Sequence, residues 1–268
     1  MRRTKPKKRK RKLRRSDASY VKVVGALTKD VISGEVRTGG GVFYSSLGVA
    51  STKVPVNAIA VTSPGEHVEP LRGIAASLVV IRGREAVFEI RLNPTGGREL
   101  VLVRRPRPEL IVGSYGEWVV ANPVCGEIGH AEGDRLYIDV QGFVRVCKEG
   151  EKVEVNRRAR LPAKVRGAHA NYSEVPDGGL PGKETLVSYD EDGFDLILKG
   201  EGKYRIKPER LGEHSVGTGD FLLGAYVGFR ALGMRPLDAA RLAQRNLEEF
   251  STLGPVEWTR RNLGYSIS

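Results

Sequence analysis

The feature that most constrains this chain is an almost wholly apolar helix that opens on two glycines. After Asp220 the sequence continues Phe-Leu-Leu-Gly-Ala-Tyr-Val-Gly-Phe up to position 229. A helix with so little polar surface has to be covered on most sides, so it belongs to the interior of a layered domain. Gly217 and Gly219 stand where the first turn begins, and glycine there permits a tight turn and close approach of a ligand.

The start of this helix also has the chemistry of an anion site. The first N–H groups of a helix have no intrahelical partner, and the helix dipole is positive at that end. A carboxylate beside an anion hinders binding, but it suits a group that accepts a proton while the anion is being transferred. Taken alone, the stretch is explained equally well by a glycine-rich turn in which Asp220 is an ordinary first-turn acid.

Short strand-like runs alternate with helical or looped connections, which predicts an α/β fold with a mostly parallel sheet. Ligands of such sheets bind beyond the carboxyl ends of the strands, where Asp30, Asn122 and Asn171 are expected. The expected strands are 20–26, 56–61, 77–81, 118–121, 135–140, 165–168 and 185–189, with a hairpin at 192–199 and 203–206. The expected helices are one of about ten residues after the glycines at 39–41 and two closing helices, 219–232 and 236–253. The segment from about 83 to 105 is interpreted as a short β lid.

The net charge of +12 belongs to the first residues of the chain. Residues 1–15 carry eleven Lys and Arg and no acid, which leaves about +1 for the rest. We therefore expect a basic disordered tail, 1–18, ahead of one domain, 19–268. Three interpretations of residues 2–15 stay open: non-specific contact with nucleic acid, a solubilising extension, and a mis-assigned translation start.

The remaining composition predicts a reduced, cytoplasmic protein without a structural metal. Cys125 and Cys147 are the only cysteines, their spacing fits no metal pattern, and two cysteines make no disulfide framework. The four histidines form no HExxH motif. No apolar segment follows the tail as a secretory signal requires, and no run of 18 apolar residues could cross a membrane.

The common nucleotide and hydrolase motifs are missing from the sequence. It contains no GxxxxGK[ST], no GxGxxG around positions 217–224 and no GxSxG. An anion-binding helix start, a carboxylate base and polar residues at strand ends remain. Phosphoryl transfer to a hydroxyl fits this set, because that reaction depends on positioning, charge neutralisation and a base that orients the attacking hydroxyl.

Five stretches resemble the ribokinase-like (PfkB) family of carbohydrate and nucleoside kinases, over about residues 20–255. "GALTKD" is similar to the family's first strand with its substrate-binding aspartate, and "GGGVFYSSLGVA" to its substrate turn and helix. "IDVQGFVR" resembles a D-x-Q-G-F-x-R stretch of one branch, and "NYSE" the N-x-x-E motif linked to magnesium and phosphate. "GTGDFLLGAY" resembles the G-A-G-D anion hole and catalytic base.

The resemblance implies a three-layer α/β/α sandwich with a small β lid, and a kinase that uses ATP and Mg²⁺. It also implies the site: Asp220 as general base, Gly217, Thr218 and Gly219 around the transferring phosphoryl, Asp30, Gly40 and Gly41 at the acceptor, and Asn171 and Glu174 acting on Mg²⁺. Family members often dimerise, so a homodimer is a further expectation.

Two positions depart from the family pattern, and simpler interpretations stay open. His214 stands where the family usually has an aspartate, and Thr218 replaces an alanine. The open alternatives are a turn cap for Asp30, a strand-end role for Asn171, a solvated loop acid for Glu174 and a plain helix entry for Gly40 and Gly41. Asp139 is expected to be an ordinary core-strand residue.

Three functional hypotheses follow. The first is a kinase of a sugar, polyol or nucleoside, and the D-x-Q-G-F branch includes inositol-type kinases, which favours a neutral polyol. The second is a non-catalytic relative that binds a small ligand and reaches nucleic acid through the tail. The third is a nucleic-acid-binding protein that functions through the tail, which the nearly neutral body opposes.

Overall fold

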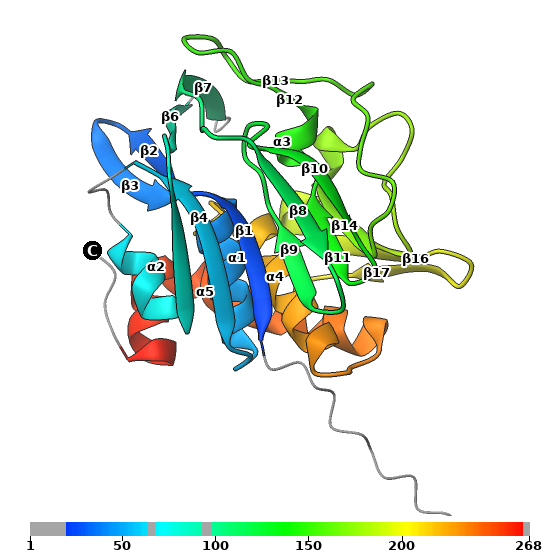
Figure 1. Ribbon diagram of the computed structural model, residues 1–268. Coiled ribbons are helices and arrows are strands. Elements are labelled where there is room, and N and C mark those ends of the chain that lie inside the picture. Colours follow the sequence, from blue (N-terminus) through cyan, green and yellow to red (C-terminus); the bar gives the residue numbers. More distant parts are fainter. Residues whose placement is uncertain (1–19, 64–67, 93–97, 265–268) are drawn as a thin grey trace, which may run out of the picture.

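The computed structural model describes residues 20–63, 68–92 and 98–264 (Figure 1). The predicted basic tail, 1–18, lies outside the described residues. The chain forms one nine-stranded sheet, a separate four-stranded sheet, and a group of helices packed on the larger sheet.

The central sheet is parallel over seven strands and ends in an antiparallel hairpin. Its order is β17-β16-β15-β14-β11-β9-β1-β4-β5, and only β16 and β17 run antiparallel to their neighbours. The inner strands are runs of Val, Ile, Leu and Ala with both faces buried, as expected of parallel strands. The strands are β1 (Val21–Ala26), β4 (Val56–Thr62), β5 (Ser77–Arg82), β9 (Trp118–Ala121), β11 (Leu136–Asp139), β14 (Gly167–Asn171), β15 (Glu184–Ser188), β16 (Phe194–Leu198) and β17 (Gly202–Ile206).

Four helices cover one face of this sheet. They are α1 (Gly41–Ser51), α2 (Glu69–Ile74), α4 (Thr218–Ala231) and α5 (Pro236–Leu263). The largest hydrophobic cluster lies between these helices and β1, β4 and their neighbours, and it includes Phe43, Phe221, Tyr226, Phe250 and Trp258. The helix expected at 236–253 is longer in the structure: a kink at Gly254, with φ 71°, separates its main part from a final segment.

The other face has a thinner cover. A second cluster joins β9, β11 and β14 to β8 (Leu110–Ser114), β10 (Ile128–Gly133) and the short α3 (Gln141–Val144). The short pair β12 (Arg145–Val146) and β13 (Glu154–Val155) follows. The predicted α/β fold with a mostly parallel sheet, flanking helices and a small β flap is confirmed, although this second outer layer contains few helical residues.

The flap is larger than the predicted lid. It has the order β3-β2-β6-β7, with β3 (Glu35–Gly39), β2 (Thr28–Ile32), β6 (Ala86–Leu92) and β7 (Arg98–Arg104). The expected segment 83–105 supplies only two of its strands, and the hairpin after β1 supplies the other two. Asp30 therefore still follows β1 closely, but it lies inside β2 and not in a turn.

The helices α1 and α4 run side by side in the same direction, almost backbone to backbone. A Cβ on Gly48 would meet the Phe221 carbonyl, and a Cβ on Gly224 would meet the Ser45 carbonyl. A third contact, between Gly228 and the Thr52 side chain, continues the same line. Only glycine fits at these crossings, so the three glycines place the first turns of both helices at one edge of the sheet.

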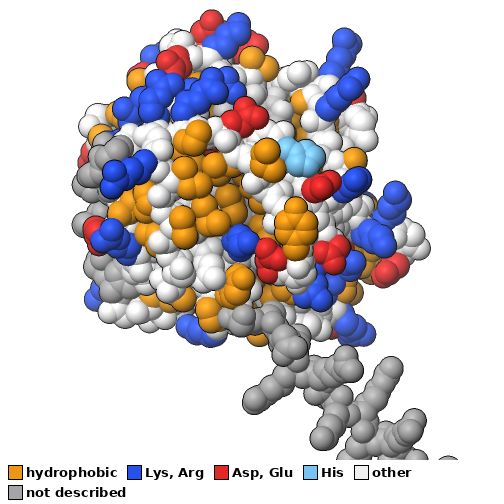
Figure 2. Space-filling model, in the orientation of Figure 1, with side chains coloured by type: hydrophobic (Ala, Val, Ile, Leu, Met, Phe, Trp, Pro, Cys, Tyr) orange, Lys and Arg blue, Asp and Glu red, His pale blue; other side chains and the backbone are white. Residues whose placement is uncertain are grey.

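Part of the sheet face away from the long helices is open. β5 is the edge strand, and it exposes Val79 and Val80 by 52% and 36%. Figure 2 shows hydrophobic side chains gathered on one face of the molecule, on the side where β4 and β5 lie in Figure 1. Within the described ranges, no helix has the length and apolar character to cross a membrane.

A buried ionic cluster lies at the amino ends of the parallel strands. The carboxylate of Glu184, the first residue of β15, is 2% exposed and accepts hydrogen bonds from four side chains. The donors are Arg166, Arg230, Tyr137 and Tyr226, at 2.5–2.9 Å. Burial alone would raise the pKa of Glu184, but the bonds from Arg230, Tyr137 and Tyr226 lower it to about 2. The cluster ties two strands, β11 and β15, to α4.

We predict that Glu184→Gln destabilises the fold by about 3 kcal/mol at pH 7, because it leaves the mostly buried Arg230 and the half-buried Arg166 without their anion. The folded pKa lies below the unfolded value, so this stabilisation is present above about pH 4.5 and is lost as the pH falls toward 2. Denaturant unfolding of both proteins at pH 7 and pH 3 measures the difference, which should shrink at pH 3. Glu257→Gln, which removes a half-buried carboxylate that pairs with the exposed Arg260 and Arg261, is the control and should change little at pH 7. Equal stability of Glu184→Gln and the parent at pH 7 would contradict the prediction.

Candidate active site

The carboxyl ends of four neighbouring strands bring polar side chains to one edge of the sheet. Asp139 ends β11, Asn171 ends β14, Ser188 ends β15, and Asn122 directly follows β9. The first turns of α1 and α4 reach the same edge, because their glycine contacts fix the two helices together. An open α/β sheet binds its ligands at this edge.

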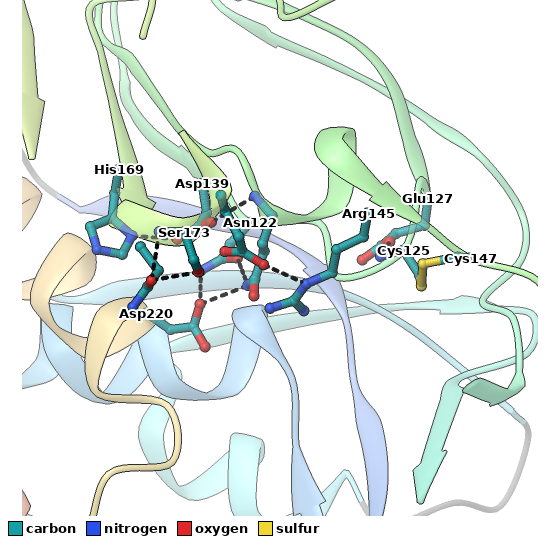
Figure 3. Close-up of polar contacts among 12 residues, drawn as sticks. Asn122, Cys125, Glu127, Asp139, Arg145, Cys147, His169, Ser173 and Asp220 are labelled. Carbon is teal, nitrogen blue, oxygen red and sulfur yellow. Dashed lines mark hydrogen bonds and ion pairs between the residues drawn. A yellow bond between two sulfur atoms is a disulfide. The ribbon is translucent and has the colours of Figure 1, made fainter. Parts of the chain in front are cut away.

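Asp220 lies at the centre of a hydrogen-bond network (Figure 3). Its Oδ1 accepts from Asn122 Nδ2 and from Gln141 Nε2, both at 2.9 Å. Ser45 of α1 donates to the Asp220 carbonyl at 3.0 Å and accepts from Asn122 Nδ2 at 2.8 Å. Both bonds to the carboxylate use Oδ1, so within the described part of the chain Oδ2 has no hydrogen-bond donor. One oxygen is held in place while the other can accept a proton.

The charges around Asp220 set its ionisation near neutrality. Burial raises its pKa, and the nearby Asp139 carboxylate raises it further. The Asn122 hydrogen bond and the positive charges of His169 and Arg145 act in the opposite direction, and the result is a pKa of about 7. A carboxylate with this pKa is a much stronger base than an ordinary aspartate.

His169, which the sequence analysis did not single out, lies between Asp139 and the start of α4. Its Nδ1 contacts Asp139 Oδ2 at 2.6 Å and its Nε2 contacts Ser188 Oγ at 2.8 Å. Burial lowers the pKa of His169, but the Asp139 carboxylate and then Asp220 raise it above its ordinary value. Asp139 is therefore part of the site and not the ordinary strand residue expected. The D-x-Q-G-F pattern contains Asp139 and could have identified it, but the sequence analysis interpreted this aspartate as a core-strand residue.

Two aromatic rings form the walls of the helix start at Gly217–Gly219. Gly217 precedes α4 in the left-handed conformation, with φ 74°, and a Cβ there would meet the Tyr44 ring. A Cβ on Gly219 would lie 2.7 Å from the His169 ring. Thr218 points elsewhere, since its hydroxyl donates to the Ser215 carbonyl at 3.0 Å. The threonine that replaces the family's alanine thus ties its side chain to the preceding turn.

Asp30, Gly40 and Gly41 lie close together where the flap meets the start of α1, and Gly41 is next to Asn122 of the Asp220 network. Asp30 is 8% exposed, accepts from Thr28 Oγ1 at 2.8 Å, and packs against Gly39. Gly40 has φ 100°, and a Cβ on Gly41 would meet the Asn122 amide. The structure therefore connects the flap aspartate, the start of α1 and the Asp220 network through adjacent residues.

Asn171 and Glu174 lie near the carboxyl edge of the sheet, but each side chain already has a hydrogen-bond partner within the protein. Asn171 Oδ1 accepts from the backbone and side chain of Ser173 at 3.0 and 2.8 Å, which caps a short helical turn. Glu174 is buried and accepts from Arg145 Nε at 2.8 Å. The described residues contain no group of three or more His, Cys, Asp or Glu side chains that could hold a metal.

The two cysteines form a disulfide, which corrects the expectation of a reduced protein. Cys125 and Cys147 have Cα atoms 5.8 Å apart although they are 22 residues apart in the sequence. Cys125 is in the loop after Asn122, and Cys147 follows Arg145, so the bond joins two segments that carry site residues (Figure 3). Spacing alone could not show this, because the fold brings the two segments together.

The buried Glu127 holds the same loop from within. Its carboxylate accepts backbone N–H groups of Ala26, Val124 and Cys125 at 2.8–3.1 Å. Burial raises the pKa of Glu127, against these hydrogen bonds, which lower it. The loop after Asn122 is thus tied to the end of β1 on one side and to β12 on the other.

His214, the other departure from the family pattern, has a packing role. Its ring lies against Gly254, where a Cβ would come within 2.7 Å, and the His214 backbone N–H donates to the Ser251 carbonyl at 3.0 Å. His214 therefore anchors the segment before α4 to the kink of α5.

Comparison with known proteins rests on structure, since no family model and no curated protein sequence matches the chain. A pyrophosphate-dependent kinase in the ribokinase family, complexed with a pyrophosphate analog and myo-inositol, has a TM-score of 0.72 at 20% identity. The match covers 91% of this chain and 99% of that one.

Two more distant solved structures have the same architecture. Arabidopsis thaliana ribokinase, complexed with ribose and ATP, has a TM-score of 0.60 at 13% identity over 93% of this chain and 100% of that one. A nucleoside kinase from Methanocaldococcus jannaschii has a TM-score of 0.63 at 11% identity over 92% and 98%. The class defined here is an α/β protein with a glycine-rich helix start at the carboxyl edge of its parallel sheet and a carboxylate in the first turn of that helix. The chain has the ribokinase-like fold, as the sequence resemblance implied.

We predict that replacing Cys125 and Cys147 together by serine destabilises the fold by about 3 kcal/mol, the entropy expected for a closed loop of this length. Thermal unfolding with and without dithiothreitol measures it: the reductant should lower the Tm of the parent toward that of the double variant and leave the variant unchanged. A parent whose Tm is insensitive to the reductant and equal to that of the variant would refute a stabilising disulfide.

Proposed function

We propose that this protein is a small-molecule kinase that transfers a phosphoryl group to a hydroxyl of a neutral polyol of the inositol type. The observation that carries the proposal is Asp220 itself. It is fixed through one oxygen, open at the other, has a pKa of about 7, and stands in the first turn of an anion-binding helix. A protein that only binds an anion has no use for a carboxylate in that place.

In the proposed reaction Asp220 Oδ2 takes the proton of the acceptor hydroxyl as its oxygen attacks the terminal phosphorus of the donor. The new bond joins that oxygen to phosphorus, and the bridging P–O bond of the donor breaks, with its electron pair leaving on the remaining phosphate. The amides at Gly217, Thr218 and Gly219 and the helix dipole stabilise the charge on the transferring group. The Tyr44 and His169 rings confine it.

The acceptor would bind between the flap and the start of α1. The Asp30 carboxylate can accept hydrogen bonds from two neighbouring hydroxyls, and Gly40 and Gly41 allow the ligand close to the backbone. The inositol-type acceptor is supported by the D-x-Q-G-F stretch and by the myo-inositol complex of the similar kinase. The acceptor KM of an Asp30→Ala variant, measured beside its donor KM, tests this role.

ATP is the proposed donor, and the ATP complex of the similar ribokinase supports it. A second candidate donor is pyrophosphate, because the similar kinase with a TM-score of 0.72 depends on it. Parallel assays of myo-inositol phosphorylation with each donor decide between them. Binding of donor without turnover of any polyol, sugar or nucleoside would favour the non-catalytic alternative.

Asn171 and Glu174 fit a magnesium ion only as outer partners. Their oxygens are of the type that Mg²⁺ prefers, but Ser173 and Arg145 already occupy them. They would act through water on an ion held mainly by the donor phosphates, and that ion would neutralise phosphate charge. Arg145 adds a fixed positive charge at the same place.

We predict that Asp220→Asn lowers kcat by about 10²–10⁴-fold while the fold stays intact, because the base is lost and the hydrogen bonds to Oδ1 are kept. Steady-state assays on the accepted substrate, with circular dichroism as the folding check, measure it. Asp238→Asn, an exposed acid in the first turn of α5, is the matched control and should keep full activity. Parent-like turnover by Asp220→Asn would rule out its role as base.

We predict that kcat/KM rises with pH through a midpoint near 7, because Asp220 is active only when deprotonated and its pKa is raised to about 7. Asn122→Ala should move the midpoint upward, since the Asn122 hydrogen bond lowers that pKa. A pH series of initial rates for the two proteins is the measurement. A flat profile from pH 5 to 9, or a downward shift in Asn122→Ala, would be inconsistent with the assignment.

A further inference from the structure

The face of the central sheet away from the long helices has an apolar floor, formed by Ile59 of β4 with Val79 and Ile81 of β5. Ile59 pairs with Val79 in register, and residues paired in this way on parallel strands point to the same side of the sheet. Val79 is 52% exposed, and Ile59 and Ile81 are partly exposed. Ile59 packs against the cluster of Val24 and Val112, on the side opposite to α1 and α4, so these helices do not cover the floor. Figure 2 shows this face of the molecule, with hydrophobic side chains gathered on it.

An apolar ridge stands beside the floor, formed by Ile111 of β8 and by Tyr115, which follows β8. β8 lies on the same side of the sheet as the floor, because its Val112 belongs to the cluster on which Ile59 packs. Side chains alternate along a strand, so Ile111 points away from the sheet, and it is 84% exposed. The Tyr115 ring lies close to Gly113, which is on the same side of β8 as Ile111, and it is 90% exposed.

An ion pair lies between the floor and the ridge. Lys22 Nζ of β1 is 2.7 Å from Glu117 Oε1, and the two side chains are 26% and 23% exposed. Lys22 is in register with Asn57, two residues before Ile59, and so borders the floor. Glu117 Oε2 accepts the Tyr115 N–H at 2.9 Å, and so borders the ridge. The strip between the two apolar parts is therefore polar, and the pair within it is electrically neutral.

We propose that this face binds a second copy of the chain, with the ridge of each copy packed on the floor of the other. The floor and the ridge lie on opposite sides of the Lys22–Glu117 pair, so a two-fold axis through that pair exchanges them. The contact is then isologous, as in most closed dimers. The same rotation turns Lys22 of each copy toward Glu117 of the other, so the centre of the interface has complementary charges.

The apolar surface is large enough to contribute to a stable dimer. A buried aromatic side chain removes about 150–250 Å² from water, so the two Tyr115 side chains account for about 300–500 Å². A stable interface buries about 1,200–2,000 Å² in total, so these tyrosines supply about a quarter of that area. The two floors and the two Ile111 side chains add to it. A contiguous exposed apolar area rimmed by polar residues is typical of a protein–protein contact.

The flap fits such a contact less well. The large apolar side chains that it exposes among its described residues are Val36 of β3 and Val103 of β7, at 60% and 49%. β2 and β6 lie between β3 and β7, so two strands separate these valines. On the floor, by contrast, Ile59 and Val79 are neighbours in register.

The proposed contact includes no residue of the candidate active site. Asp220 and its partners lie at the carboxyl edge of the sheet, whereas Lys22 and Glu117 lie at the amino ends of β1 and β9. The inference therefore does not rest on the proposed function.

Sedimentation equilibrium of the full chain tests the proposal. The parent should be a dimer at about 10 µM, and Tyr115→Glu and Val79→Glu should each raise the dimer dissociation constant at least about tenfold, because each places a carboxylate in the apolar contact. Val36→Glu puts the same charge on an exposed valine of the flap and is the matched control, which should remain dimeric. Circular dichroism checks that each variant is folded.

Two results would overturn the proposal. One is a parent that stays monomeric up to about 100 µM. The other is a dimer that Val36→Glu dissociates while Tyr115→Glu and Val79→Glu leave it intact, which would assign the interface to the flap.

Cross-linking tests the pairing of ridge with floor. Both native cysteines are in the disulfide, so an introduced cysteine is the one free thiol of each variant. The Tyr115→Cys and Val79→Cys proteins, mixed and treated with a short bis-maleimide, should give a covalent dimer that neither protein gives alone. Cross-linking of either protein with itself, with no increase in the mixture, would contradict the two-fold exchange and overturn the proposal.

Discussion

The close crossing of α1 and α4 is the contact on which the rest of the site depends. Gly48, Gly224 and Gly228 leave no room for side chains, so two parallel helices begin at one point at the carboxyl edge of the sheet. Ser45 then reaches the Asp220 carbonyl and Asn122 from α1. Without this close approach, the glycines before α1, where the acceptor is proposed to bind, would lie apart from the first turn of α4, where the phosphoryl group is proposed to bind.

Five ionisable side chains lie close together at the carboxyl edge of the sheet. Asp139, Asp220 and Glu174 lie among His169 and Arg145, and each acid influences the pKa of at least one of these bases. Asp139 and Glu174 are paired with His169 and Arg145, and Asp220 has only neutral amides as partners. Burial and the nearby Asp139 carboxylate raise the pKa of Asp220 to about 7, and within the described residues no cation in direct contact with Asp220 opposes them.

The sequence was sufficient to predict the strands and helices whose position depends on a local pattern of apolar residues and glycines. Apolar runs predicted the parallel strands, and the glycines at 217 and 219 before an apolar stretch predicted where α4 begins. The sequence was insufficient to predict contacts between segments that are far apart along the chain. In the sequence, nothing marks His169 as a site residue, because its contact with Asp139 forms only when β11 and β14 pair. The disulfide likewise forms only because folding brings Cys125 to Cys147. The hairpin of β2 and β3 was missed because charged and polar residues interrupt its alternation.

The same strands and helix carry a stabilising cluster at one edge of the sheet and the candidate site at the other edge. β11 carries Tyr137 in the Glu184 cluster and Asp139 in the site, and β15 carries Glu184 at its start and Ser188 at its end. The helix α4 also contributes to both, with Arg230 in the Glu184 cluster and Asp220 in the candidate site. The hydrogen-bonded Glu184 cluster fixes the amino ends of β11 and β15 and the carboxyl end of α4, and these rigid elements carry that order to the other edge of the sheet. The cluster is two residues from Asp139 along β11, four from Ser188 along β15 and ten from Asp220 along α4, so these elements support the hydrogen bonds that hold the three residues at the site.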